Sequence, residues 1–125
     1  MTLPIIHNIE NKNAFAQLLQ KNPGVVIIKF GAEWCGPCKK IEALVNSCMS
    51  KMPDNIQCVM VDVDHSIEIY GFLKTKKMIN GIPAILAYYA GNLNYIPDDA
   101  VIGADPTQVT LFFERCLEQA ASSSS

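Results

Sequence analysis

The sequence lacks any apolar run close to the roughly 20 residues that a membrane-spanning helix needs. Residues 1–4 do not form a basic stretch followed by an apolar block, as a secretion signal would. The cysteines number five in a chain of 125 residues, and an odd count argues against a scaffold of structural disulfides and fits a reducing compartment. We therefore expect no membrane association and a cytoplasmic location.

An excess of charge of one sign is also lacking. Ten basic and twelve acidic residues give a net charge of −2, and they are scattered along the chain. Proteins that bind nucleic acids or anionic membrane surfaces usually carry concentrated positive charge. The charge pattern therefore gives no reason to expect a nucleic-acid partner or a membrane-surface partner.

The chain has one Cys-x-x-Cys pair, and it lacks a second such pair and paired histidines. A structural zinc site needs four ligands at suitable spacing. The side chains left to supply the other two ligands are Cys48, Cys58, Cys116, His7 and His65. Their spacing does not suit such a site, so we expect no metal, and we expect the three cysteines to serve as small apolar side chains.

Half of the residues are apolar, which is enough for one well-filled core in a chain of 125 residues but too little for two domains of ordinary size. We therefore expect a single domain over residues 1–120. Residues 121–125 end in four serines and are expected to form a disordered tail.

Apolar runs with strand character alternate with helically spaced apolar residues. The expected strands are at residues 5–9, 25–31, 56–63 and 84–89 and within 95–102, and the expected helices are at 11–21, 39–52 and 64–77 and from 106 onward. Asp105 is the expected cap of the last helix, with Pro106 at its first position. This order predicts an α/β fold in which a mixed sheet carries helices on both faces.

One stretch carries recognisable chemistry. Residues 32–39 read Ala-Glu-Trp-Cys-Gly-Pro-Cys-Lys, where a buried strand ends and a helix begins. The first amides of a helix lack partners within it and attract negative charge. We therefore expect the pKa of Cys35 to fall from about 8.5 to about 7 or below, as for reactive thiols in such positions. Cys38, one turn further on, suits the role of the second, resolving thiol.

This stretch after an apolar strand resembles the active site of thioredoxins. Gly-Ile-Pro at residues 81–83, Ile-Gly-Ala at 102–104 and the order of the elements extend the resemblance to about residues 5–120. It implies a thioredoxin fold, a central mixed sheet of about five strands flanked by about four helices. It also implies exchange with protein disulfides, in which Cys35 attacks and Cys38 resolves the mixed disulfide without a bound cofactor.

The resemblance also assigns a substrate surface around Cys35. Trp34 would shield the dithiol and contact substrate, although burial in the core is the alternative. Pro83 would follow a cis peptide bond that turns the backbone of Ile82 toward Cys35, whereas a trans proline in an edge strand is the alternative. The flat apolar patch that would bind extended substrate segments consists of Gly36, Pro37, Ile82, Pro83 and Gly103.

One residue departs from the family pattern. Thioredoxins usually have a buried aspartate on the strand behind the dithiol, and Lys29 occupies that position here. A cation near Cys38 would favour thiolates and make the disulfide more oxidising. We hypothesise that Lys29 raises the reduction potential in this way, unless its side chain extends to the surface and has little influence.

Three functions fit these features. The first is a monomeric protein-disulfide reductase that is recharged by a thioredoxin reductase or an equivalent donor. The second is a thioredoxin-fold oxidase or isomerase with a raised reduction potential, which Lys29 would permit. The third is an interaction module that binds partners beside Pro83 without turnover, for which an intact dithiol would be unnecessary.

Overall fold

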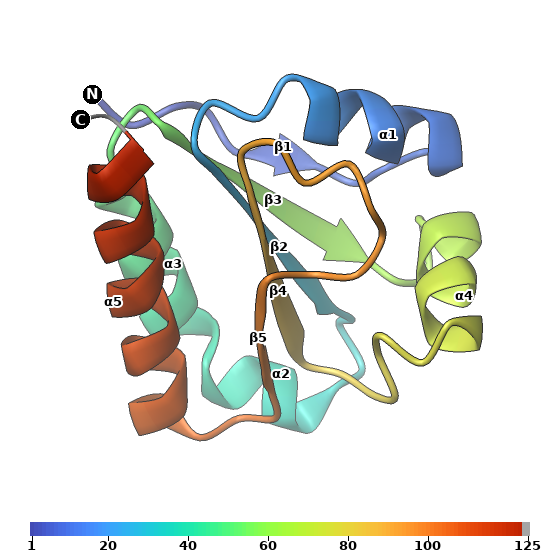
Figure 1. The fold of residues 1–125 in the computed structure, drawn as a ribbon. Helices are drawn as coiled ribbons and strands as arrows, with labels where there is room; N and C mark the ends of the chain where they lie inside the picture. The colour runs from blue at the N-terminus through green and yellow to red at the C-terminus, as the bar shows by residue number, and fades with distance from the viewer. Residues whose placement is uncertain (124–125) are drawn as a thin grey trace.

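The computed structural model describes residues 1–123, which form five strands and five helices. The elements in chain order are β1 (Ile6–His7), α1 (Lys12–Gln20), β2 (Val25–Gly31), α2 (Gly36–Lys40), α3 (Glu42–Ser50), β3 (Ile56–Asp62), α4 (Ile67–Thr75), β4 (Ala84–Tyr89), β5 (Asp99–Ile102) and α5 (Pro106–Ser123) (Figure 1). No helix within these residues is long and apolar enough to cross a membrane.

The strands form one mixed sheet in the order β1-β3-β2-β4-β5. Strands β1, β3 and β2 run parallel, and β4 is antiparallel to both β2 and β5. The parallel β2–β3 pair is joined through α2 and α3, as a parallel connection requires. The expected mixed sheet of about five strands is therefore confirmed, with β2 at its centre.

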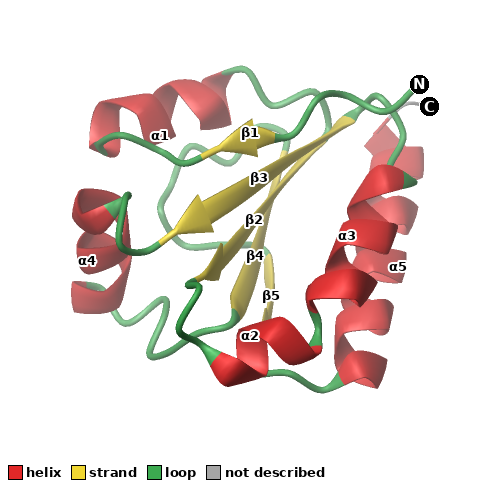
Figure 2. Cartoon of the chain, turned by 180° about the vertical axis from the view of Figure 1, so that it is seen from behind, coloured by secondary structure: helices red, strands yellow, loops and turns green. Residues whose placement is uncertain are grey.

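Helices cover both faces of the sheet. Helices α3 and α5 lie on one face and α1 and α4 on the other (Figures 1 and 2). Along β2, Val25 and Ile27 belong to the core under α3 and α5, whereas Val26 and Ile28 belong to the core under α1 and α4. This follows from the alternation of side chains in a strand, and it explains why β2 is apolar on both faces.

Side-chain caps set the start of two helices. Asn11 accepts a hydrogen bond from the amide of Ala14 at the start of α1. Asp105 accepts hydrogen bonds from the amides of Thr107 and Gln108 at the start of α5. These contacts satisfy amides that have no partner within the helix, and the Asp105 cap agrees with the sequence-based prediction.

The helix predicted to follow the Cys-x-x-Cys motif and to reach residue 52 is divided into two. Helix α2 starts at Gly36 and ends at Lys40, and α3 starts at Glu42. Ile41 between them has φ −106° and ψ 5°, and its side chain is fully buried in the core under α3 and α5. The bend explains why the sheet has five helices around it instead of about four.

The last helix continues beyond the predicted end of the domain. Helix α5 includes residues 121–123, which the sequence placed in a disordered tail. No glycine or proline interrupts the chain after Ala120, and the hydroxyl of Ser123 donates a hydrogen bond to the carbonyl of Gln119. The expected tail is therefore wrong for these three residues, and residues 124–125 lie outside the described part of the chain.

Candidate active site

Cys35 and Cys38 form a disulfide beyond the end of β2, at the start of α2. Figure 2 shows the short loop that joins these two elements. Their Cα atoms are 5.2 Å apart. Cys35 caps α2, because its Sγ accepts a hydrogen bond of 3.1 Å from the amide of Cys38. An amide aimed at this sulfur stabilises negative charge on it when the disulfide is open.

Both sulfur-bearing residues are almost fully buried. The exposed fraction is 4% for Cys35 and 3% for Cys38. Exposure therefore does not separate an attacking from a resolving cysteine in the disulfide form. What separates them is their surroundings, because backbone and apolar groups lie on the side of Cys35 and a charged cleft lies on the side of Cys38.

Backbone from two other segments borders Cys35. The peptide bond between Ile82 and Pro83 is cis, and the Ile82 carbonyl oxygen lies 3.8 Å from Cys35 Sγ. The amide of Gly103 donates a hydrogen bond of 2.9 Å to the Pro83 carbonyl. Gly103 has φ +97°, a conformation that costs other residues free energy. The structure thus brings residues 82, 83 and 103 together beside Cys35.

On another side of the disulfide, Gly36 and Pro37 line a shallow groove of about 610 Å³. The opposite wall is the start of α5 with Ala104, Asp105 and Pro106. A Cβ on Gly36 would meet nothing within 4 Å, so this side of the disulfide is open. The predicted patch residues therefore surround Cys35.

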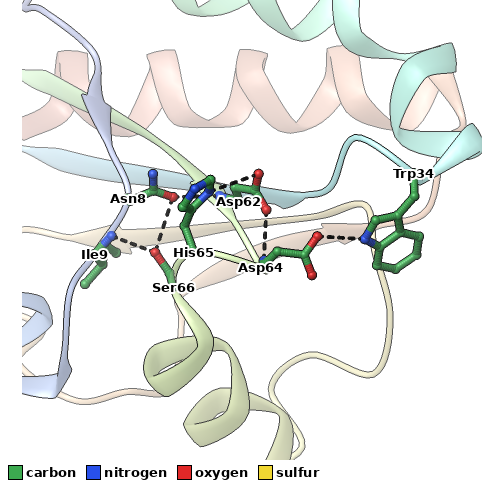
Figure 3. Close-up of polar contacts among 7 residues, drawn as sticks. All are labelled: Asn8, Ile9, Trp34, Asp62, Asp64, His65 and Ser66. Carbon is green, nitrogen blue, oxygen red and sulfur yellow. Dashed lines mark hydrogen bonds and ion pairs between the residues drawn. The ribbon is translucent and has the colours of Figure 1, made fainter.

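Trp34 is exposed and is held by an acidic side chain. Its exposed fraction is 68%, so the alternative of a core tryptophan is wrong. The indole Nε1 donates a hydrogen bond of 2.8 Å to Asp64 Oδ2 (Figure 3). The amide of Asp64 in turn donates to Asp62 Oδ1 over 2.8 Å. The tryptophan ring is therefore fixed to the loop that follows β3.

That loop is itself tied to the segment that follows β1. Asn8 Oδ1 accepts hydrogen bonds from the amide of Asp62 and from the hydroxyl of Ser66, and Ser66 Oγ accepts one from the amide of Ile9 (Figure 3). Ser66 is 1% exposed. His65 Nδ1 lies 3.3 Å from Asp62 Oδ2. These contacts give the loop that carries Asp64 a defined position.

Behind the disulfide, Lys29 approaches Cys38. A Cβ built on Gly31 would stand 3.5 Å from Cys38 Sγ and 3.5 Å from Lys29 Nζ. Burial lowers the pKa of Lys29, and the nearby Glu42 carboxylate partly opposes that shift. Lys29 is half-buried and lines a cleft of about 320 Å³ together with Gly31, Cys38 and Glu42. The Lys29 side chain therefore lies in the cleft behind the disulfide, beside Cys38.

The remaining cysteines lie away from this chemistry. Burial raises the pKa of Cys58 and of Cys116 to about 12, and both side chains belong to the core under α3 and α5. Burial also raises the pKa of Cys48, which is half-buried. Within residues 1–123, no group of three or more histidine, cysteine or acidic side chains is placed to hold a metal ion.

Sequence reasoning missed Asp64 and Glu42. Asp64 lies 30 positions from Trp34, and the local sequence pattern around it predicts only the start of a helix. The sequence does hold a signal for Asp64. Trp34 follows β2 and Asp64 follows β3, these strands are parallel, and residues after neighbouring parallel strands meet at one edge of a sheet. Glu42 gave no such signal, since its approach to Lys29 depends on how α3 packs against the sheet.

Comparison with known proteins gives one consistent result. A family model described as Thioredoxin matches residues 6–112. Thioredoxin from Ictalurus punctatus is 40% identical over 78 residues, which cover 59% of this chain and 70% of that protein. Chloroplastic thioredoxin M2 from Arabidopsis thaliana is 31% identical over 110 residues, which cover 87% of this chain and 55% of that protein.

Solved structures agree. The thioredoxin of Malassezia sympodialis is 26% identical and superposes with a TM-score of 0.69, over 96% of each chain. The chain spans only about half the length of two plant relatives that it matches, 55% of thioredoxin M2 and 46% of chloroplastic thioredoxin Y2 of Arabidopsis thaliana.

Proposed function

The chain belongs to the thioredoxin family, and we propose that it is a protein-disulfide reductase that works by dithiol–disulfide exchange through Cys35 and Cys38. One observation supports this most directly. The Cys35–Cys38 disulfide lies at the start of a helix, with the sulfur of Cys35 between the amide of Cys38 and the carbonyl of Ile82. Because the Cys38 amide donates a hydrogen bond to Cys35 Sγ, Cys35 is the better candidate for a stable thiolate.

The reaction balances with the two cysteines alone. In the reduced protein the Cys35 thiolate attacks one sulfur of a substrate disulfide, a mixed disulfide forms, and the first substrate thiolate leaves. Cys38 loses its proton and attacks Cys35 Sγ, which releases the second substrate thiolate and forms the Cys35–Cys38 bond. Two electrons pass from the protein to the substrate. The two sulfurs carry these electrons, so we propose that no bound cofactor is needed.

Substrates would be extended protein segments that contain a disulfide. The border of Cys35 consists largely of the backbone of residues 82, 83 and 103 and the flat surface of Gly36 and Pro37. Such a border suits pairing with an extended chain. Trp34, exposed and fixed by Asp64, would contact the segment beside the scissile disulfide.

The partners follow from this chemistry. Each turnover leaves the protein oxidised, so a thioredoxin reductase or an equivalent dithiol donor must restore it. We propose that the protein acts as a monomer, because the site is complete within one chain. Three free cysteines support a reducing compartment, and we propose the cytoplasm, a location that cell fractionation and immunoblotting can check.

The test is reduction of a protein disulfide driven by dithiothreitol. The unmodified protein should accelerate reduction, and Cys35→Ser should abolish the acceleration. Cys38→Ser should accumulate a mixed disulfide through Cys35, visible by mass spectrometry. Cys48→Ser, which removes a cysteine outside the site, is the matched control and should retain activity. Retained binding of a partner by the Cys35→Ser, Cys38→Ser double variant, without turnover by the unmodified protein, would favour an interaction module instead.

Lys29 is the observation that favours a second function, an oxidase or isomerase. Its ammonium group near Cys38 would stabilise the dithiolate form and raise the reduction potential. Equilibration with glutathione distinguishes the two functions. A potential near the thioredoxin value of about −270 mV supports the reductase, whereas one above about −200 mV supports oxidation or isomerisation.

A further inference from the structure

Lys29 and Cys38 both border the space left by a glycine. Cys38 Sγ and Lys29 Nζ each lie 3.5 Å from the point where a Cβ on Gly31 would stand, so they can be no further apart than twice that distance. A Cβ at position 31 would contact both groups. With glycine at position 31, no β-carbon fills the space that these two groups border, which we call the Gly31 space.

The same space opens into the cleft of about 320 Å³ behind the disulfide. The strand β2 and the neighbouring strands β1 and β3 form one wall, and α2 and α3 form the other. The titratable and charged side chains that line the cleft in addition to Lys29 and Cys38 are His7, Glu33, Lys39, Glu42 and Asp62. Cys38 is itself 3% exposed, so the cleft is the route from its sulfur to solvent on this side.

Among these side chains, the structure distinguishes Lys29 and Glu42. Lys29 is the cation that shares the Gly31 space with Cys38 Sγ. Glu42 is the charged group whose interaction with Lys29 opposes the effect of burial, which nevertheless keeps the pKa of Lys29 below its usual value. The two side chains oppose one another in their effect on an anion at Cys38.

We propose that Lys29 is the electrostatic partner of the resolving sulfur, stabilising the Cys38 thiolate across the Gly31 space, and that Glu42 limits this effect. The proposal deepens the exchange function proposed above, since it assigns a group to its second step. In the mixed disulfide, Cys35 is bonded to substrate and Cys38 is the remaining thiol of the pair. Its proton leaves through the cleft to solvent, and Cys38 attacks Cys35 Sγ as an anion held by the Lys29 ammonium.

The electrons and protons balance in this step. Cys38 supplies the electron pair for the new Cys35–Cys38 bond, and the substrate sulfur takes the pair of the broken bond and leaves as a thiolate. Lys29 keeps its proton throughout and is therefore not a general base. A buried carboxylate in place of Lys29 would instead accept the proton that leaves Cys38. The pH dependence of Cys38 reactivity therefore distinguishes a stabilising cation from a general base.

The experiment measures the reactivity of the Cys38 thiol in a Cys35→Ser variant. Position 35 is uncharged in this variant, as it is in the mixed disulfide. Iodoacetamide alkylation is followed against pH, and peptide mapping by mass spectrometry separates Cys38 from the other cysteines. Lys29→Met should move the alkylation midpoint up by about one pH unit, equal to about tenfold slower alkylation below both midpoints. Lys29→Arg, which keeps the charge, should keep the midpoint within a few tenths of a unit.

A second variant keeps the proposal testable if Lys29→Met does not fold. Glu42→Gln should move the midpoint down, because it removes the negative charge that opposes the thiolate. Lys40→Met is the matched control, because it removes an exposed cation of α2 that does not line the cleft, and it should leave the midpoint in place.

The proposal is overturned if folded Lys29→Met has an unchanged or lower midpoint, or if Glu42→Gln leaves or raises it. Turnover plays no part in this measurement. A chain that fails to reduce protein disulfides but shows the Lys29 shift would therefore contradict the proposed function alone.

Discussion

The side of the disulfide that faces Cys35 and the side that faces Cys38 are built from different groups. On the Cys35 side lie the backbone of residues 82, 83 and 103 and the exposed ring of Trp34. On the Cys38 side lie Lys29 and Glu42 in a charged cleft. The contrast suggests a division of labour, in which the first side determines which substrate binds and the second determines how readily the disulfide forms.

Reversing the charge behind Cys38 should have the largest effect. Lys29→Asp replaces a charge that stabilises thiolates with one that destabilises them, and should lower the reduction potential by about 30–60 mV, the equivalent of one to two pKa units. Equilibration against glutathione or dithiothreitol measures this. The division of labour predicts that KM for a protein substrate stays unchanged. An unchanged reduction potential would show that Lys29 does not influence the disulfide.

The ring on the Cys35 side should affect the substrate and not the potential. Trp34→Ala should lower kcat/KM for a protein disulfide about tenfold, or about 1.4 kcal/mol, since an exposed aromatic contact is lost. Trp34→Phe keeps an aromatic ring and should therefore show a smaller loss of kcat/KM. Stopped-flow kinetics on these variants measures kcat/KM, and redox equilibration measures the reduction potential. A Trp34→Ala potential that shifts as far as that of Lys29→Asp would contradict the proposed division of labour.

Asp64 should have a smaller effect on the same side. Asp64→Ala removes the acceptor of the indole hydrogen bond and should reduce kcat/KM about threefold, because the ring loses its fixed orientation but stays in place. Trp34 is the sole tryptophan of the sequence, so its fluorescence reports the change directly. The exposed Asp54 offers the control Asp54→Ala, and equal spectra for both variants would argue against a positioning role.

The buried cysteine of α5 should have no effect on exchange at neutral pH. The pKa of Cys116 is about 12 in the fold, raised by burial from 9.0. Its thiol therefore contributes fully to stability below pH 9.0 and loses that contribution as the pH rises toward 12. The loss at pH 10 is about 1.4 kcal/mol. Urea unfolding of Cys116→Ala should show a shallower alkaline decline, and an identical decline would contradict this.

Much of the fold could be predicted because local patterns and tertiary packing agree. The β-branched run of β2 and the capped start of α5 specify the same elements alone and in the fold. The bend at Ile41 could not be predicted, since no proline or glycine marks it in residues 39–52. The last turn of α5 could not be predicted either, because a run of serines is typical of disordered segments.

The candidate site also combines features that local motifs predict with features that depend on tertiary packing. Cys35, Cys38 and the Ile82–Pro83 bond lie in short motifs, and the resemblance of these motifs to the thioredoxin family is enough to place them together. The hydrogen bond between Trp34 and Asp64 joins positions 30 apart. The cleft behind Cys38 depends on the packing of three strands and two helices, which no local pattern records.

The lengths of the strands have a further consequence. The sheet has strands of seven and six residues at its centre, but its edges are β1 with two residues and β5 with four. Short edges offer few unpaired amides and carbonyls to a neighbouring chain, so aggregation by edge-to-edge pairing has little template. An extended substrate segment of the kind proposed above would therefore find little at either edge of the sheet with which to pair.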